Sequence, residues 1–86
     1  MKPLVPIIMG SKSDLDHGRA VSAALDVLGI ASEIRIASAH KVATYLLEML
    51  AVYESDPSPK VYVTIAGRSN ALSGLVDGNV VAPVIA

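Results

Sequence analysis

Short apolar runs alternate along the chain with longer stretches in which apolar residues recur at helical spacing. Residues Leu4–Met9 are all apolar, which predicts a strand buried on both faces, although Pro6 is unfavourable in a strictly central strand. The next apolar positions recur at steps of three or four and predict one buried helical face. They are Leu15, Gly18, Val21, Leu25 and Leu28. We expect this helix to begin after an N-cap at Ser13 and to end at Gly29.

The rest of the chain continues the alternation. Residues 32–36 alternate polar and apolar side chains, which is typical of a half-buried strand. A second helix is predicted by apolar residues at i, i+3, i+4, i+7, i+8 and i+11, namely Val42, Tyr45, Leu46, Met49, Leu50 and Tyr53. Residues 61–65 are rich in β-branched side chains and predict a strand. Residues 71–76 predict a short helix, and residues 80–86 predict a last strand, where Pro83 is unfavourable.

This order of elements predicts the α/β fold class, with a three-layer α/β/α arrangement. Strands that alternate with helices form a parallel sheet with right-handed crossovers and helices on both faces. We expect residues 1–86 to form a single domain. Because the predicted fourth strand runs to the last residue, we expect this domain to be incomplete, truncated after that strand.

Composition narrows the function classes. Hydrophobic residues make up 52% of the 86 residues and charged residues only 17%, so we expect burial against partner subunits or a missing remainder of the domain. The net charge of −1 leaves no basic surplus for nucleic acid. The chain has no cysteine, which excludes thiolate chemistry within it. No apolar run approaches the roughly 18 residues of a membrane helix, so we expect no membrane partner and a cytoplasmic location.

Three small polar loops follow the first three predicted strands, at the sheet edge where α/β folds bind ligands. Residues 10–14 offer free backbone N–H groups at a helix N-terminus and the hydroxyls of Ser11 and Ser13, which suit a phosphate. Asp14 could accept hydrogen bonds from sugar hydroxyls. The alternatives are a plain capped turn and an aspartate that only complements the helix dipole.

The second and third loops add candidate chemistry. His40 is a plausible proton shuttle because the imidazole pKa lies near neutrality, and Lys41 could hold a phosphate as a point charge. Gly67 would let a ligand approach the backbone closely, and Arg68 and Ser69 are donors. The alternatives are a solvent-facing histidine and a capped turn. His17 lies off the apolar stripe of its helix and is expected at the surface. No set of metal ligands is visible, so we expect no metal.

Together the three loops resemble one enzyme family. They read Gly10-Ser11-Lys12-Ser13-Asp14, Ser38-Ala39-His40-Lys41 and Ala66-Gly67-Arg68-Ser69-Asn70-Ala71-Leu72. They look like the loops of aminoimidazole ribonucleotide (AIR) carboxylase of de novo purine synthesis, the PurE family. The third loop resembles the class that uses free CO2, since the related N5-carboxyaminoimidazole ribonucleotide mutase typically has Gly-Gly-Ala-Ala-His there. Lys41, where the mutase usually has arginine, agrees.

The resemblance implies a parallel sheet of the flavodoxin or Rossmann type, assembled as a homo-octamer, with no cofactor. It implies that AIR is carboxylated at C4 with CO2 to give 4-carboxy-AIR. His40 matches the general acid/base of the family. Ser11, Ser38 and Lys41 match phosphate-binding positions, Asp14 the ribose position, and Gly67 and Ser69 the side of the base and CO2. Arg68 could orient the carboxylate or stabilise its loop.

Two other functions stay open on the sequence. One is the mutase, which has the same fold and a different source of CO2. The other is a non-catalytic, flavodoxin-like phosphate-binding module.

Overall fold

The computed structural model describes residues 3–37, 43–65 and 71–85. Its elements, in chain order, are β1 (Leu4–Met9), a single 3₁₀ turn η1 (Lys12–Asp14), α1 (Leu15–Val27), β2 (Ala31–Ile36), α2 (Ala43–Ser55), β3 (Tyr62–Ile65), α3 (Ala71–Asp77) and β4 (Val84–Ile85). The alternation of strands and helices is the one that the hydrophobic pattern predicts.

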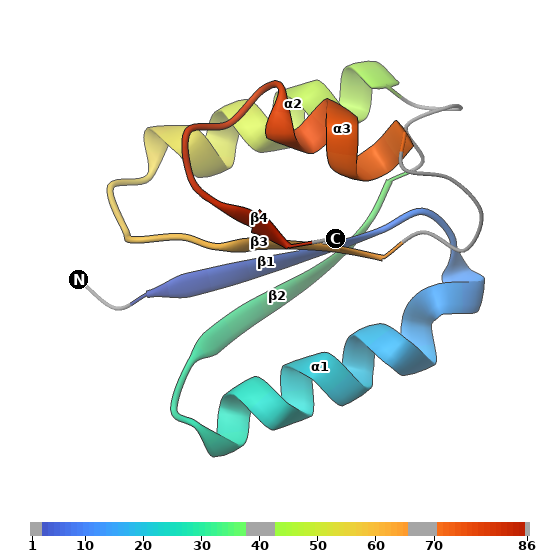
Figure 1. The fold of residues 1–86 in the computed structure, drawn as a ribbon, viewed down its shortest axis with the longest axis vertical. Helices are drawn as coiled ribbons and strands as arrows, with labels where there is room; N and C mark the ends of the chain where they lie inside the picture. The colour runs from blue at the N-terminus through green and yellow to red at the C-terminus, as the bar shows by residue number, and fades with distance from the viewer. Residues whose placement is uncertain (1–2, 38–42, 66–70, 86) are drawn as a thin grey trace.

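The four strands form one parallel sheet in the order β2-β1-β3-β4. Figure 1 shows α1 on one face of this sheet and α2 and α3 on the other. The predicted three-layer α/β/α arrangement is therefore confirmed. An order in which β1 lies between β2 and β3 is that of flavodoxin-like sheets, which bind ligands where the strand order reverses, at the carboxyl ends of β1 and β3.

β1 is buried on both faces, as its uninterrupted apolar run predicts. Ile8 packs with α2 and α3 in one core cluster, while Val5, Ile7 and Met9 pack against the α1 side in a second cluster. Successive side chains of a strand point to opposite faces, so a strand covered by helices on both sides requires apolar residues throughout.

Pro6 is tolerated in this central strand because the ladder to β3 is interrupted beside it. Leu4 donates its N–H to the Pro59 carbonyl and accepts from the Val61 N–H, and Gly10 donates to the Ile65 carbonyl. Even-numbered residues of β1 therefore direct their backbone groups toward β3. Proline cannot donate there. The β1–β3 pairing begins only at Ile7↔Val63, with an isolated bridge at Leu4↔Lys60.

α1 ends at the predicted glycine, and its predicted apolar face is confirmed except at Leu28. Gly29 has φ +75°, its N–H bonds to the Asp26 carbonyl, and the Ile30 N–H bonds to the Leu25 carbonyl, the two bonds of a Schellman motif. The turn brings Ile30 onto the second core cluster beside Leu25. Leu28 is left 71% exposed, so its assignment to the buried face was wrong.

α2 places Leu46, Met49, Leu50 and Tyr53 in the core, as its periodicity predicts. Tyr45 is exposed, and Val42 lies outside the described residues.

The last strand is much shorter than predicted. Only Val84 and Ile85 pair, with Tyr62 and Val63 of β3, whereas residues 80–86 were expected to be extended. The preceding segment is held by side-chain and core contacts instead, because the Val81 N–H bonds to the Glu54 carboxylate and Val80 and Ala82 pack against the first core cluster. Pro83 has no N–H to give to a ladder.

Candidate functional site

The carboxyl ends of β1, β2 and β3 lie side by side at one edge of the sheet (Figure 1). The Ala37 N–H bonds to the Met9 carbonyl at 2.8 Å, and the Gly10 N–H bonds to the Ile65 carbonyl at 2.9 Å. These two bonds hold Gly10 on the residue that ends β3, and its neighbour Met9 on the residue that follows β2. The loop after β1 therefore begins between the ends of the two neighbouring strands.

The loop after β1 gathers three polar side chains. The hydroxyl oxygens of Ser11 and Ser13 are 2.6 Å apart, and the Ser11 hydroxyl lies 3.5 Å from the Asp14 carboxylate, a distance at which only a weak hydrogen bond remains. The Asp14 N–H bonds to the Ser11 carbonyl at 3.2 Å. Ser11 and Ser13 are exposed, while Asp14 is half-buried.

Ser13 is not the N-cap that the sequence predicts. It lies inside the 3₁₀ turn η1, and Asp14 takes the N-cap position of α1 without a side-chain capping bond. Ser11 stands at the N-cap of η1 with φ −161° and also makes no side-chain capping bond. The 3₁₀ turn η1 adds three residues of helical backbone before α1 begins at Leu15. The two serine hydroxyls therefore face each other and the solvent and are not bonded to helix N–H groups.

The structure describes only two of the predicted site residues, Ser11 and Asp14, and it brings these two together. Ser38, His40 and Lys41 of the second loop, and Gly67, Arg68 and Ser69 of the third, lie outside the described residues. Their predicted roles stay predictions. The neighbours that precede the two loops are described: Ala37 is buried, and Ile65 is bonded to Gly10.

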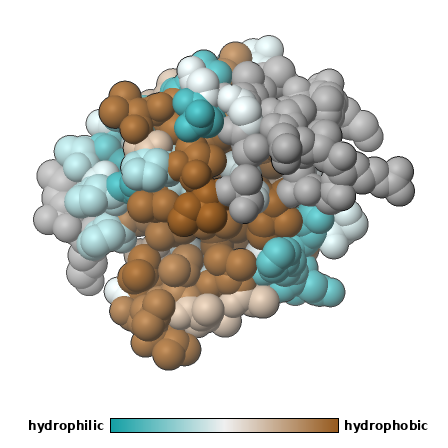
Figure 2. Space-filling model, viewed as in Figure 1, coloured by the Kyte–Doolittle hydropathy of each residue, from teal (hydrophilic) through white to brown (hydrophobic). Residues whose placement is uncertain are grey.

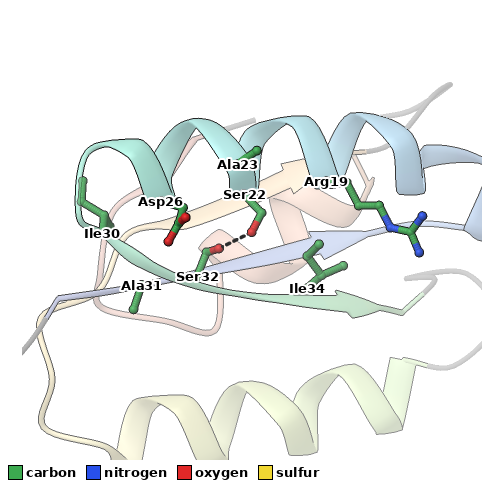
Figure 3. A pocket seen from close by; sticks show the side chains of 8 residues that line it. All are labelled: Arg19, Ser22, Ala23, Asp26, Ile30, Ala31, Ser32 and Ile34. Atoms are coloured by element: carbon green, nitrogen blue, oxygen red, sulfur yellow. Dashed lines mark hydrogen bonds between the residues drawn. The ribbon is translucent and has the colours of Figure 1, made fainter.

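Among the described residues, two surface cavities lie away from this edge. A pocket of about 450 Å³ runs between α1 and the outer strand β2, and its wall includes the hydrogen bond between the hydroxyls of Ser22 and Ser32, 2.7 Å apart (Figure 3). Arg19 and Asp26 also line this pocket. Sequence reasoning passed over these residues because each is an isolated polar position on a helix or a strand.

A second cavity of about 490 Å³ lies between β2 and α2. There the Tyr53 hydroxyl donates to the Glu33 carboxylate at 2.7 Å and accepts from Arg35 Nε at 3.0 Å. Burial raises the pKa of the Tyr53 hydroxyl, while the bond from Arg35 acts to lower it and the bond to Glu33 to raise it. The bond to Tyr53 raises the pKa of Arg35. The three groups satisfy one another and leave no group poised for proton transfer.

The described residues carry neither a metal centre nor a membrane span. Within residues 3–37, 43–65 and 71–85, no three His, Asp or Glu side chains come together as metal ligands do. Across the same residues, no helix has both the length and the hydropathy that crossing a bilayer requires. His17 is exposed on α1, which confirms the surface position expected for it.

The parallel order β2-β1-β3-β4, with its polar loop at the carboxyl edge, defines a flavodoxin-like α/β domain. Comparison with known proteins is more specific. The profile of the AIR carboxylase family matches residues 4–86, so the chain belongs to this family.

Two named relatives and one solved structure illustrate the similarity. The phosphoribosylaminoimidazole carboxylase of Treponema denticola is 54% identical over 86 residues, which are 100% of this chain and 54% of that protein. The carboxylase of Archaeoglobus fulgidus is 54% identical over 80 residues, 93% of this chain and 43% of that protein. The crystal structure of Treponema denticola PurE superposes with a TM-score of 0.96 at 52% identity, covering 98% of this chain and 53% of that one.

The chain therefore spans about half the length of the curated relatives that it matches. A more distant relative, the bifunctional phosphoribosylaminoimidazole carboxylase/succinocarboxamide synthetase of Mus musculus, is 44% identical over 81 residues, 94% of this chain and 19% of that protein.

Proposed function

We propose that this chain supplies substrate-binding and catalytic loops of a phosphoribosylaminoimidazole carboxylase, which adds CO2 to C4 of AIR to give 4-carboxy-AIR in purine biosynthesis. The observation that carries the proposal is the pair of bonds from Ala37 to Met9 and from Gly10 to Ile65. They hold together the strand ends from which the three motif-bearing loops start. Family membership and the names of the relatives support the same assignment.

The loop after β1 is proposed to bind the 5′-phosphate and the ribose. The hydroxyls of Ser11 and Ser13 are exposed and make no helix-capping bond, so both can turn to donate to phosphate oxygens. The N-terminal end of α1 directs a positive dipole toward the same place. Asp14 is proposed to accept from a ribose hydroxyl, and Ser38 and Lys41 to complete the phosphate site.

His40 is proposed as the general base. C4 of the aminoimidazole is enamine-like, so its electron pair forms the new bond to the carbon of CO2. The C4 proton must then leave, and an imidazole with a pKa near neutrality is suited to accept it. Gly67 and Ser69 are proposed to line the side of the base and CO2, and Arg68 to orient the new carboxylate or to stabilise its loop.

A homo-octamer in the cytoplasm is the proposed working form. Figure 2 shows apolar side chains gathered over the C-terminal part of α1, where Val27 is 86% exposed and Leu28 is 71% exposed. Exposed apolar patches of this kind mark interaction surfaces, and symmetric closed assemblies cover them.

The test is a carboxylation assay with AIR and bicarbonate or CO2, run on the purified protein and on His40→Asn. If His40 moves the proton, the variant should lose a factor of about 10² to 10⁴ in rate while its affinity for AIR changes little. His17→Asn is the matched control, because His17 is exposed on α1. Turnover of the N5-carboxylated substrate without CO2-dependent activity would assign the mutase, and binding without turnover would assign a non-catalytic module.

A further inference from the structure

α1 packs on β1 through a close contact between Gly18 and Met9, and Gly18 has no side chain. Gly18 is buried on the inner face of α1. A Cβ atom placed on it would lie 2.5 Å from Met9 Sδ, 3.6 Å from Met9 Cγ and 3.7 Å from Met9 Cε. Carbon atoms do not approach sulfur this closely, and ordinary contact starts at 3.4 Å. An alanine at position 18 therefore requires the Met9 side chain or α1 to shift.

That displacement is not absorbed freely. Met9 is fully buried and belongs to a core cluster with Val5 and Ile7 of β1 and apolar residues of α1 and the neighbouring strands. A methionine side chain is adaptable, but in a close-packed interior a shifted side chain displaces its neighbours. Any part of the displacement that the Met9 side chain does not absorb moves α1 away from the sheet.

Both residues are joined directly to the proposed ligand loop. Met9 is the last residue of β1, immediately before Gly10, and its carbonyl accepts the bond from Ala37 that holds the start of the second loop. Gly18 lies about one helical turn beyond Asp14, which is the N-cap residue of α1. The Gly18–Met9 contact is therefore, with the packing of Leu15 on the same core cluster, one of the packing contacts close to the loop that carries Ser11 and Asp14.

We propose that Gly18 is a positioning residue for substrate binding: through its contact with Met9 it sets how closely the N-terminal end of α1, with Ser11 and Asp14, approaches the carboxyl edge of the sheet. This inference rests on the proposed function, since it assigns Ser11 and Asp14 to the phosphate and ribose. Gly18 touches no ligand itself. Because Gly18 has no side chain, α1 can approach the sheet closely, and this approach sets the position of Ser11 and Asp14, which are proposed to contact the ligand.

The experiment is a cycle of Gly18→Ala, Met9→Ala and the double variant, with two readouts. The first is the backbone amide NMR shifts of residues 10–14, which report the loop position without any ligand. The second is the KM for AIR, together with the affinity for ribose 5-phosphate as a probe. Gly18→Ala should raise KM and weaken ribose 5-phosphate binding by roughly tenfold, the loss expected when one hydrogen bond to a charged group is weakened, and kcat should fall less.

Met9→Ala removes the sulfur atom, so the double variant should regain amide shifts and affinity closer to the wild type than Gly18→Ala does. Such a non-additive recovery identifies the contact itself as the cause. Leu25→Ala is the control, because Leu25 packs in the same cluster near the far end of α1 and should lower stability without changing KM. Should Gly18→Ala fail to fold, Met9→Ala and the double variant carry the test through the same two readouts.

The outcomes separate the two proposals. Amide shifts that move in Gly18→Ala and recover in the double variant support the positioning role, whether or not ribose 5-phosphate binds. Failure of the wild type and of every variant to bind ribose 5-phosphate would refute the proposed function and not the positioning role. A lower melting temperature with unchanged amide shifts and unchanged KM would overturn the positioning role. A loss of affinity that Met9→Ala does not repair would overturn it as well.

Discussion

At the scale of single residues, the Glu54 carboxylate, which lies outside the candidate site, joins two distant parts of the chain by hydrogen bonds. It accepts one hydrogen bond from the Tyr62 hydroxyl and one from the Val81 N–H, both at 2.7 Å. The Tyr62 ring is fully buried and meets Tyr53 edge to face, with centroids 6.2 Å apart. One acidic side chain on α2 thus fixes both a core tyrosine and the segment that leads into β4.

This arrangement predicts an acid-sensitive contribution to stability. The bond from the Val81 N–H, and after it the bond from Tyr62, lower the pKa of Glu54. A carboxylate whose pKa is lowered by folding stabilises the protein above its unfolded-state pKa, and this stabilisation disappears as the pH falls through the folded-state pKa. Glu54→Gln should therefore lower the free energy of unfolding by about 1–2 kcal/mol near neutral pH, and by less in acid.

Urea unfolding of both proteins between about pH 7 and pH 3 measures this difference. Tyr62→Phe is the control, because it removes one of the two bonds and leaves the carboxylate titratable. A difference in stability between wild type and Glu54→Gln that stays constant across the range would contradict the assignment.

At the scale of elements, the end of α1 depends on one backbone conformation. Gly29 has φ +75°, and the Schellman bonds around it turn Ile30 back onto the core cluster. The left-handed conformation is costly for any residue with a Cβ atom. The element boundary and the packing of the following strand therefore depend on the same glycine.

Gly29→Ala should lower the free energy of unfolding by about 1–2 kcal/mol, although an added Cβ meets no atom within 4 Å there. Gly74→Ala is the matched variant, because Gly74 lies within α3, is exposed, and also has open space around an added Cβ. In a helix that change should stabilise by about 0.5–1 kcal/mol. Thermal or urea unfolding of the two variants should show opposite signs, and equal signs would refute the conformational explanation.

At the scale of the whole molecule, large apolar side chains are exposed at several places among the described residues, including the end of α1 and the segment around β4. Val27 and Leu28 protrude at the end of α1, while Val81 is 98% exposed and Ile85 is 57% exposed near and in β4. Water-exposed apolar area of this kind favours association. Part of the excess of hydrophobic residues in the composition is thus exposed at the surface and not buried in the core.

We expect the 86-residue chain to self-associate through these places. Light scattering should give a mass well above the 8.9 kDa of one chain, and Val27→Lys combined with Leu28→Lys should lower it. Thr44→Lys is the control, because Thr44 is an exposed polar residue on α2 and adds the same kind of charge elsewhere. A monodisperse monomer that melts cooperatively would contradict this expectation and favour a small binding module.

Local patterns in the sequence were sufficient for the three layers, the parallel sheet and the Gly29 turn. The continuous apolar run of Leu4–Met9 requires cover on both faces, and Gly29 supplies a conformation that other residues avoid. The motif loops were likewise recognisable, because their residue types stand in a fixed local order. Each of these features is encoded within a few neighbouring residues, where hydrophobic periodicity and turn chemistry act.

Other features arise between segments that are distant in the sequence, and no local pattern contains them. The exposure of Leu28 follows from the return of Ile30 to the core, and the shortness of β4 from the bond that Glu54 makes to Val81. In the sequence, Gly18 is only one more position of the apolar helical face. The close contact that excludes a side chain there is seen only in the structure, where Gly18 lies against Met9. Packing distances depend on which two surfaces meet, and that pairing is decided only when the chain has folded.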